Sequence, residues 1–312
     1  MNGKELREGL WLTLPGCLGA GLLLYAKPVS AAVSQSLGLC TGVLLPTLFP
    51  FFVLSSLLCG GGTARLAPRP DGISARLLGL PGTLTPALLL GAVGGYPVGA
   101  RTVCQLYSQG RCTKDQAMHA LLFCNNAGPA FLLGAVGTGM LGDGRLGLRL
   151  WLIHLAAALL LGLFYRRKSL PVKPDSITSI SVKNKGGTAL FLQAVTDSMG
   201  AFLNVCAFVL IFAVLMCLLE QLPLLSRLPA PWDGLLYGFA ELTGGAAKLA
   251  ASRLPQRMLL PALSFLCGWG GLSVQCQTVD LLHRAGLPCR GYLKAKLLHG
   301  CVAAVLTLLI SG

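Results

Sequence analysis

Long apolar runs joined by short polar stretches fill this chain, and they restrict it to folds that are compatible with a lipid bilayer. Residues 146–165 are typical of one uninterrupted span, and crossing the hydrocarbon of a bilayer takes roughly 20 mainly apolar residues. Only 12% of the 312 residues are charged and 54% are apolar, whereas roughly 25% charged residues is usual in a soluble domain. We therefore predict an all-α, polytopic integral membrane protein with about eight transmembrane helices.

Much of the positive charge of the chain lies in one loop, and charged loops predict which side of the membrane they occupy. The formal net charge of +14 would suggest a nucleic-acid partner in a soluble protein. Here the loop 166–187 carries six basic side chains against the single acid Asp175, and basic loops beside membrane spans mark the cytoplasmic side. We therefore expect a multi-pass protein of the cell membrane with this loop in the cytoplasm, in contact with lipid and not with nucleic acid.

Glycine and proline are too frequent for a bundle of plain spanning helices. The chain has 40 Gly and 18 Pro, and several of them form runs inside apolar segments. Proline removes a backbone donor from a helix, so Pro46 and Pro50 predict a kink or two half-helices. Close helix packing is the alternative explanation for the glycines between Gly94 and Gly99. The predicted helix-breaking residues are Gly94, Gly95, Pro97, Gly99, Gly128, Pro129, Gly270 and Gly271.

One glycine break occurs twice. Moving the chain by 176 positions aligns residues 94–110 with residues 270–286, and seven of the seventeen pairs are identical, where about two are expected by chance. A break motif present once in each half is typical of transporters built from repeats, with the binding site at the repeat interface.

These features divide the chain into four parts. They are an N-terminal transmembrane helix (1–34), a first repeat (35–165), the basic loop (166–187) and a second repeat (188–312). A signal peptide is the alternative for the N-terminus, because residues 29–31 are small, but the apolar run before them is long enough to span. In the first repeat, Thr113 and Gln116 form a capping-box pattern that predicts a helix start.

Polar residues inside the apolar segments are the candidate substrate-binding residues. Glu241 is the single acid in its segment, and its alternative role is an ion pair with Lys248. Arg101 either faces a cavity or extends to the membrane interface. Asn125 and Asn126, beside Gly128 and Pro129, either contact a ligand or cap helices, and the polar residues after Gly271 either bind a solute or bridge helices. The full set is Tyr96, Arg101, Asn125, Asn126, Glu241, Thr243, Ser273, Gln275 and Gln277.

The sequence favours neither an enzyme nor a metalloprotein. The four histidines lack the spacing of metal ligands, and the chain has no nucleophile elbow, no P-loop and no pair of carboxylates placed for acid–base chemistry. The twelve cysteines include no C-x-x-C pair, which favours a role as small packing residues. We expect no catalytic residues, no metal site and no cofactor.

Several phrases resemble the YlbJ family of sporulation integral membrane proteins, which is grouped with proteins that carry a nucleoside-recognition or Gate domain. They are LPTLFPFF at residues 45–52, GYPVGAR at 95–101, FCNNAGP at 123–129, ELTGG at 241–245 and WGGLSVQ at 269–275. The resemblance covers roughly residues 35–300. It implies two Gate-like repeats with broken or re-entrant helices, an endospore-forming bacterium as the source, and a role in spore or cortex development.

Two functional hypotheses follow from these patterns. The first is a transporter or channel for a small polar solute during sporulation, with its site between the broken helices. The second is a non-transporting membrane scaffold, acting as a homo-oligomer or with other sporulation membrane proteins, that is needed for spore envelope or cortex assembly. Polar residues that converge on one cavity between the breaks favour the first, and breaks packed shut by Leu and Phe favour the second.

Overall fold

The computed structural model describes residues 3–60, 73–166, 187–223 and 228–311, and every regular element in these ranges is a helix. The basic loop lies outside the described residues except at its ends, so its cytoplasmic location stays a prediction. The helices are α1 (Gly3–Leu24), α2 (Ala26–Leu39), η1 (Cys40–Leu44), α3 (Leu45–Gly60), α4 (Ile73–Leu78), η3 (Gly82–Leu84), α5 (Thr85–Val93), α6 (Val98–Ser108), α7 (Lys114–Leu121), η4 (Ala130–Met140), α8 (Gly144–Phe164), α9 (Gly187–Glu220), α10 (Trp232–Ala240), α11 (Leu242–Ala251), α12 (Gln256–Trp269), α13 (Gly271–Arg284) and α14 (Tyr292–Ser311).

Four segments in the described part of the chain are long and apolar enough to cross a membrane. They are α8, α9, the α12–α13 pair (Gln256–Arg284) and residues Tyr292–Ile310 of α14; Pro15–Leu24 and Ala26–Gly42 make a fifth if this pair, bent by 96°, is one span. The prediction of a helical membrane protein is confirmed, whereas about eight spans and two Gate-like repeats stay predictions.

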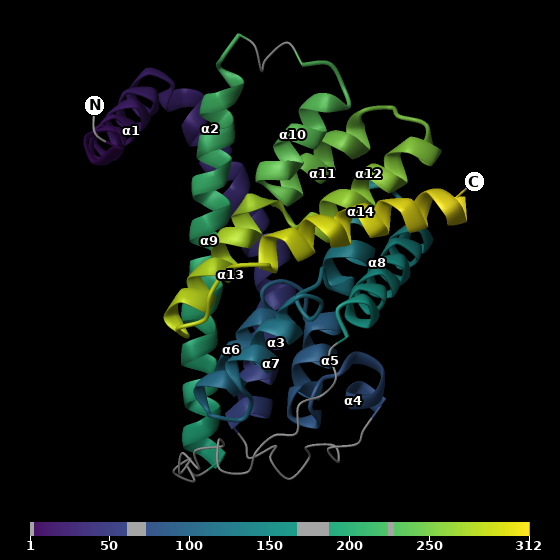
Figure 1. The fold of residues 1–312 in the computed structure, drawn as a ribbon. Helices are drawn as coiled ribbons and strands as arrows, with labels where there is room; N and C mark the ends of the chain where they lie inside the picture. Colours follow the sequence, from purple (N-terminus) through teal and green to yellow (C-terminus); the bar gives the residue numbers. More distant parts are fainter. Residues whose placement is uncertain (1–2, 61–72, 167–186, 224–227, 312) are drawn as a thin grey trace.

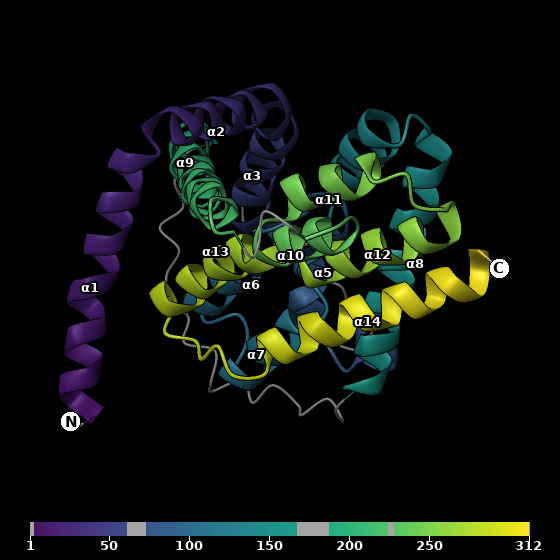
Figure 2. The ribbon, with the colours of Figure 1, turned by 90° about the horizontal axis from the view of Figure 1, so that it is seen from above.

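The long helices do not form a parallel bundle. Helix α9 runs the height of the molecule in Figure 1 and is seen along its axis in Figure 2, whereas α14 extends across that direction in both views. Helices α2 and α3 pack against α9, while α14 packs against α12 and α8. Large apolar side chains remain exposed on the outer faces, such as Leu203 of α9 (60%) and Leu309 of α14 (75%). Such faces suit lipid tails better than water.

The chain is irregular where the paired prolines predict it. Helix α2 is followed by the π-helical turn η1, whose last hydrogen bond runs from the Leu45 N–H to the Cys40 carbonyl, five residues earlier. Pro46 follows immediately and has no N–H to continue the ordinary ladder, which accounts for the position of the wider turn. Helix α3 then continues through Pro50.

The predicted capping box is present at the start of α7. The Gln116 N–H donates to the Thr113 hydroxyl over 3.3 Å, and the Thr113 N–H donates to the Gln116 side-chain oxygen over 2.9 Å. These two bonds satisfy backbone donors that the first helical turn leaves without a partner.

Glycines let helix backbones touch. A Cβ atom on Gly268 of α12 would lie 2.6 Å from the Cα of Gly300 in α14, and one on Gly245 of α11 would lie 2.0 Å from the Cα of Gly238 in α10. Small residues at helix contacts are the usual means of association in membranes, where apolar burial supplies little driving force.

This packing predicts a clear difference between two glycine substitutions. Gly268→Ala places a methyl group against the backbone of α14 and should cost about 1–3 kcal/mol, lowering the thermal unfolding midpoint in detergent micelles. Gly200→Ala in α9 is the matched control, because a Cβ there meets no atom within 4 Å, and it should leave the midpoint unchanged or raise it. Equal midpoints for the two variants would contradict the packing described here.

Candidate functional site

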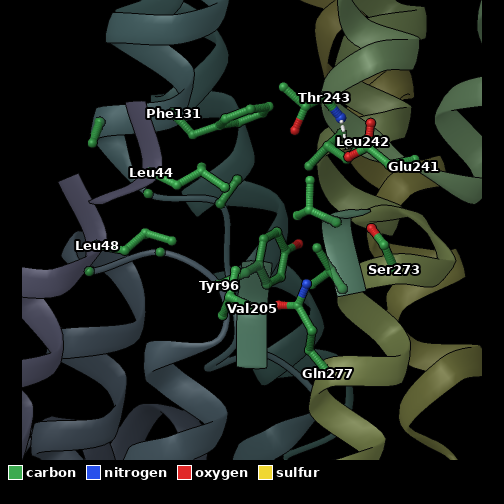
Figure 3. A pocket seen from close by; sticks show the side chains of 17 residues that line it. Leu44, Leu48, Tyr96, Phe131, Val205, Glu241, Leu242, Thr243, Ser273 and Gln277 are labelled. Carbon is green, nitrogen blue, oxygen red and sulfur yellow. Dashed lines mark hydrogen bonds between the residues drawn. The ribbon is translucent and has the colours of Figure 1, made fainter. Parts of the chain in front are cut away.

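A cavity of about 70 Å³ lies where the helix breaks of the two halves meet (Figure 3). Gly94, Gly95 and Tyr96 of the α5–α6 break line it, together with Ala127 and Gly128 from the segment before η4. The opposite wall comes from the second half of the chain. Its lining residues are Glu241, Leu242, Thr243, Ser273, Val274 and Gln277.

The first break is built by glycines that allow close contact with a second non-helical segment. Helix α5 ends at Val93 and α6 begins at Val98, and between them Gly95 has a φ of +78° that strongly favours glycine. A Cβ atom on Gly99 would lie 2.0 Å from the Cys124 carbonyl oxygen, and one on Gly128 would lie 2.8 Å from the Gly95 Cα. The glycines therefore serve both the break and the packing, the two roles that the sequence left open.

The second break stands at the aligned position in the other half. Helix α12 ends at Trp269 and α13 begins at Gly271, and Gly270 between them has a φ of +89°. The Tyr96 hydroxyl donates to the Cys267 carbonyl oxygen over 2.9 Å, near the end of α12. The two copies of the break are thus in direct contact.

A further break lies at Glu241, between α10 and α11. Its carboxylate accepts hydrogen bonds from the Thr243 N–H (3.0 Å) and the Gly244 N–H (2.6 Å), so it caps the start of α11. Only 5% of its surface is exposed. A carboxylate at a helix N-terminus is favoured by the helix dipole and by its backbone donors.

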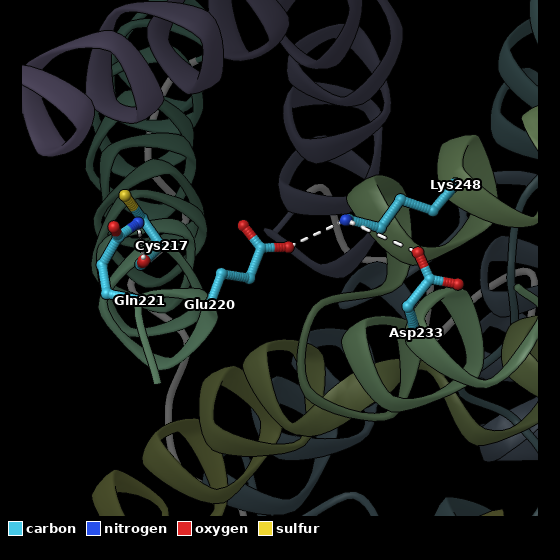
Figure 4. Close-up of polar contacts among 5 residues, drawn as sticks. All are labelled: Cys217, Glu220, Gln221, Asp233 and Lys248. Carbon is cyan, nitrogen blue, oxygen red and sulfur yellow. Dashed lines mark hydrogen bonds and ion pairs between the residues drawn. The ribbon is translucent and has the colours of Figure 1, made fainter. Parts of the chain in front are cut away.

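The alternative partner for Glu241 is engaged elsewhere. Figure 4 shows Lys248 between Glu220 at the end of α9 and Asp233 at the start of α10, with N–O distances of 2.8 and 3.8 Å. These side chains are between a third and two-fifths exposed, so the ion pairs add little stability. Their effect is to tie α9 to the α10–α11 hairpin.

The cavity has one polar and one apolar wall. Glu241, Thr243, Ser273 and Gln277 lie on one side of it, and Leu44, Leu48 and Phe131 lie on the other (Figure 3). Val205 and Val209 of α9 complete the apolar lining. The Ser273 hydroxyl is 1% exposed and has no hydrogen-bond partner among the described residues. A buried polar group without a partner is costly, and one that lines a cavity is a natural contact for a polar ligand.

Asn125 links the two halves instead of lining the cavity. Its side-chain oxygen accepts from the Ala100 N–H (3.3 Å), and its amide nitrogen donates to Thr278 (3.1 Å) and to the Tyr292 hydroxyl (2.8 Å). The side chain is fully buried, so these three bonds satisfy it without water.

The remaining predicted residues lie outside the cavity wall. Asn126 donates to the Phe123 carbonyl oxygen over 3.0 Å. Arg101 is buried, donates to the Phe52 carbonyl oxygen over 3.5 Å and lies 5.4 Å from the Phe52 ring centre. Gln275 donates to the Trp269 carbonyl oxygen within its own hairpin. The cavity therefore collects Tyr96, Glu241, Thr243, Ser273 and Gln277 of the nine predicted residues.

Three polar residues near the cavity escaped the sequence reasoning. Lys296 and His299 of α14 and His154 of α8 form one buried cluster. The histidines lack metal-ligand spacing in the sequence, and this spacing says nothing about other roles. Among the described residues, no group of three His, Cys, Asp or Glu is suited to a metal. The pattern that indicates them is an ionisable residue inside an apolar run, the same pattern that singles out Glu241.

Broken apolar helices around a small, mainly apolar cavity with polar groups on one side define a helical membrane protein with a candidate solute site. Over 94% of its length the chain is 26% identical to the sporulation integral membrane protein YlbJ of Bacillus subtilis (strain 168), of which the match covers 80%. This similarity confirms the resemblance to the YlbJ family. No family model matches the sequence, and no solved structure matches it.

The hydrogen bonds of Asn125 predict a large difference between neighbouring substitutions. Asn125→Ala leaves the Ala100 N–H without its partner and removes both side-chain bonds to the second half, so it should destabilise the protein by about 1–3 kcal/mol. Asn126→Ala removes one local bond and should cost less. Thermal unfolding in detergent measures both, and an equal or larger loss for Asn126→Ala would contradict the assigned role.

Proposed function

We propose that this protein is a multi-pass transporter or channel that moves a small polar solute through the cavity between its broken helices. The observation that carries the proposal is that four polar side chains of the second half face one cavity with Tyr96 of the first half, at the point where the two breaks touch. Transporters that are built from repeats hold their substrate at this kind of position.

The helix ends around the cavity support a polar ligand. Ser273 and Val274, in the first turn of α13, line the cavity, and the N–H groups of a first turn attract anionic or polar atoms. Ser273 adds an unpaired hydroxyl, and Gln277 adds an amide one turn later. These groups favour a solute with hydrogen-bond acceptors and donors over an apolar one.

The size of the cavity limits what fits without movement. A water molecule needs roughly 10–15 Å³ of such volume, so 70 Å³ holds about five waters or a small ion with part of its hydration shell. A larger solute needs the apolar wall to move. The apolar lining includes residues of η1, α3 and α9, and α3 packs against α9, whereas the polar wall belongs to α11 and α13. A shift of η1, α3 and α9 relative to α11 and α13 would therefore change the volume of the cavity.

The second candidate function is a non-transporting scaffold for spore envelope or cortex assembly. Apolar side chains from η1, α3 and η4 on one wall favour it, because they pack the breaks closed on that side. The word "sporulation" in the name of the Bacillus subtilis relative fits both candidates. We propose that the chain acts during spore formation in either case.

Solute flux in proteoliposomes tests the transport proposal. The panel consists of nucleosides, dipicolinate and divalent metal ions, and at least one of them should cross faster than in protein-free vesicles. Ser273→Ala and Glu241→Gln should each slow that flux about ten-fold, which corresponds to the loss of one buried hydrogen bond to the solute. Flux that neither substitution alters would refute the site, and no flux of any solute would favour the scaffold.

Ser264→Ala is the matched control for Ser273→Ala. The Ser264 hydroxyl is bonded to Thr307 over 2.6 Å and does not line the cavity, so its loss should lower the unfolding midpoint and leave flux per folded molecule unchanged. Ser273→Ala breaks no bond within the described residues and should show the reverse pattern, with unchanged stability and reduced flux.

A further inference from the structure

Three basic side chains are buried together directly behind the cavity wall. Lys296 and His299 of α14 are 0% exposed, and His154 of α8 is 2% exposed. Lys296 takes part in none of the ion pairs among the described residues. Burying a lysine without a carboxylate is expensive, and an ionisable group in such a position inside an apolar segment points to a function.

The hydrogen bonds of the cluster fix the protons of both imidazoles. His299 Nε2 faces the His154 carbonyl oxygen at 3.0 Å and must donate to it, which leaves Nδ1 as the acceptor for the Lys296 amine at 2.9 Å. His154 Nε2 accepts from the Ala127 N–H at 3.0 Å, so its proton is on Nδ1. Both rings are therefore neutral in this arrangement. An amine and an ammonium at Lys296 can both donate these bonds.

Outside the cluster, Lys296 and His154 contact residues that line the cavity or lie next to its lining. Lys296 donates to the Asn125 carbonyl oxygen over 2.7 Å, and its nitrogen lies 5.0 Å from the centre of the Tyr96 ring. Tyr96 lines the cavity, and so does Ala127, which is bonded to His154. A positive charge strengthens both contacts of Lys296, because a charged donor makes the stronger hydrogen bond and an aromatic face attracts a cation.

We propose that Lys296 is a proton-binding site whose occupancy is coupled to the shape of the cavity, with His299 and His154 as positioning residues. When Nζ carries the third proton, it holds the Asn125–Gly128 segment and Tyr96 against α14. When that proton leaves, both contacts weaken and the wall loosens. If protonation of Lys296 changes the affinity of the cavity for a ligand, then by linkage that ligand changes the proton affinity of Lys296 by the same factor.

The other titratable side chains that face this cluster carry no charge at neutral pH. Among the described residues, Tyr96 lies against Lys296, and Tyr292 of α14 is bonded to Asn125. Nothing among them competes with Lys296 for the role of charged group. A role for this proton in driving transport rests on the proposed function, whereas its coupling to the cavity wall does not.

Amide hydrogen exchange of residues 123–131 tests this coupling in the full-length protein in micelles, with no solute present. After correction for the intrinsic pH dependence of exchange, this segment should exchange about five-fold more slowly in mildly acidic than in mildly alkaline buffer. In the Lys296→Met variant this difference should disappear, and residues 123–131 should exchange fast in both buffers. Lys294→Met is the matched control, because Lys294 is exposed two residues earlier on the same helix, and it should behave as the wild type.

Lys296→Arg keeps the test decisive if Lys296→Met does not fold. Arginine stays charged in both buffers, so residues 123–131 of this variant should exchange slowly in both. Exchange that is independent of pH in the wild type, or a pH dependence that survives both substitutions, would overturn the proposal. If exchange follows the expectation while no solute crosses the membrane, the proton site stands and the transport function fails.

Discussion

The hydrogen bonds of Asn125 join the two halves of the chain at the point where both are broken. In an apolar environment every backbone N–H and C=O group must find a hydrogen-bond partner inside the protein. A helix can therefore be interrupted only where other groups of the protein bond to the backbone groups that the break frees. Asn125 satisfies one such group, because its side-chain oxygen accepts from the Ala100 N–H at the start of α6. Its amide nitrogen donates to the side-chain hydroxyls of Thr278 and Tyr292, which joins this break to the second half. The cavity exists because this junction holds the breaks together without filling the space between them.

The two copies of the break differ in the segment that follows. In the first half the chain is interrupted again between α7 and η4, whereas the aligned part of the second half is the continuous helix α14. That helix brings Lys296 and His299 against the interruption of the first half, where Lys296 bonds to the Asn125 carbonyl. One copy thus supplies an irregular backbone, and the other supplies Lys296, which donates a hydrogen bond to that backbone at Asn125.

Local patterns predicted the breaks well, because each depends on residues that are adjacent in sequence. The breaks at the glycines 94–95 and 270–271, the π turn before Pro46 and the capping box of α7 follow from the backbone preferences of those residues. The partners of each break were not predictable, because contacts such as Asn125 with Thr278 join positions 153 residues apart. The same holds for Lys248, whose ion pairs reach the end of α9.

The central claim is that the polar residues at the helix breaks, Ser273 among them, face a cavity that a small polar solute can reach. Chemical modification of Ser273→Cys by a small, water-soluble thiol reagent tests it in proteoliposomes, with peptide mass spectrometry separating this thiol from the native cysteines. Ser264→Cys is the control, because Ser264 is also buried but lies outside the cavity. The account predicts modification at 273 and none at 264, and equal protection of both would contradict it.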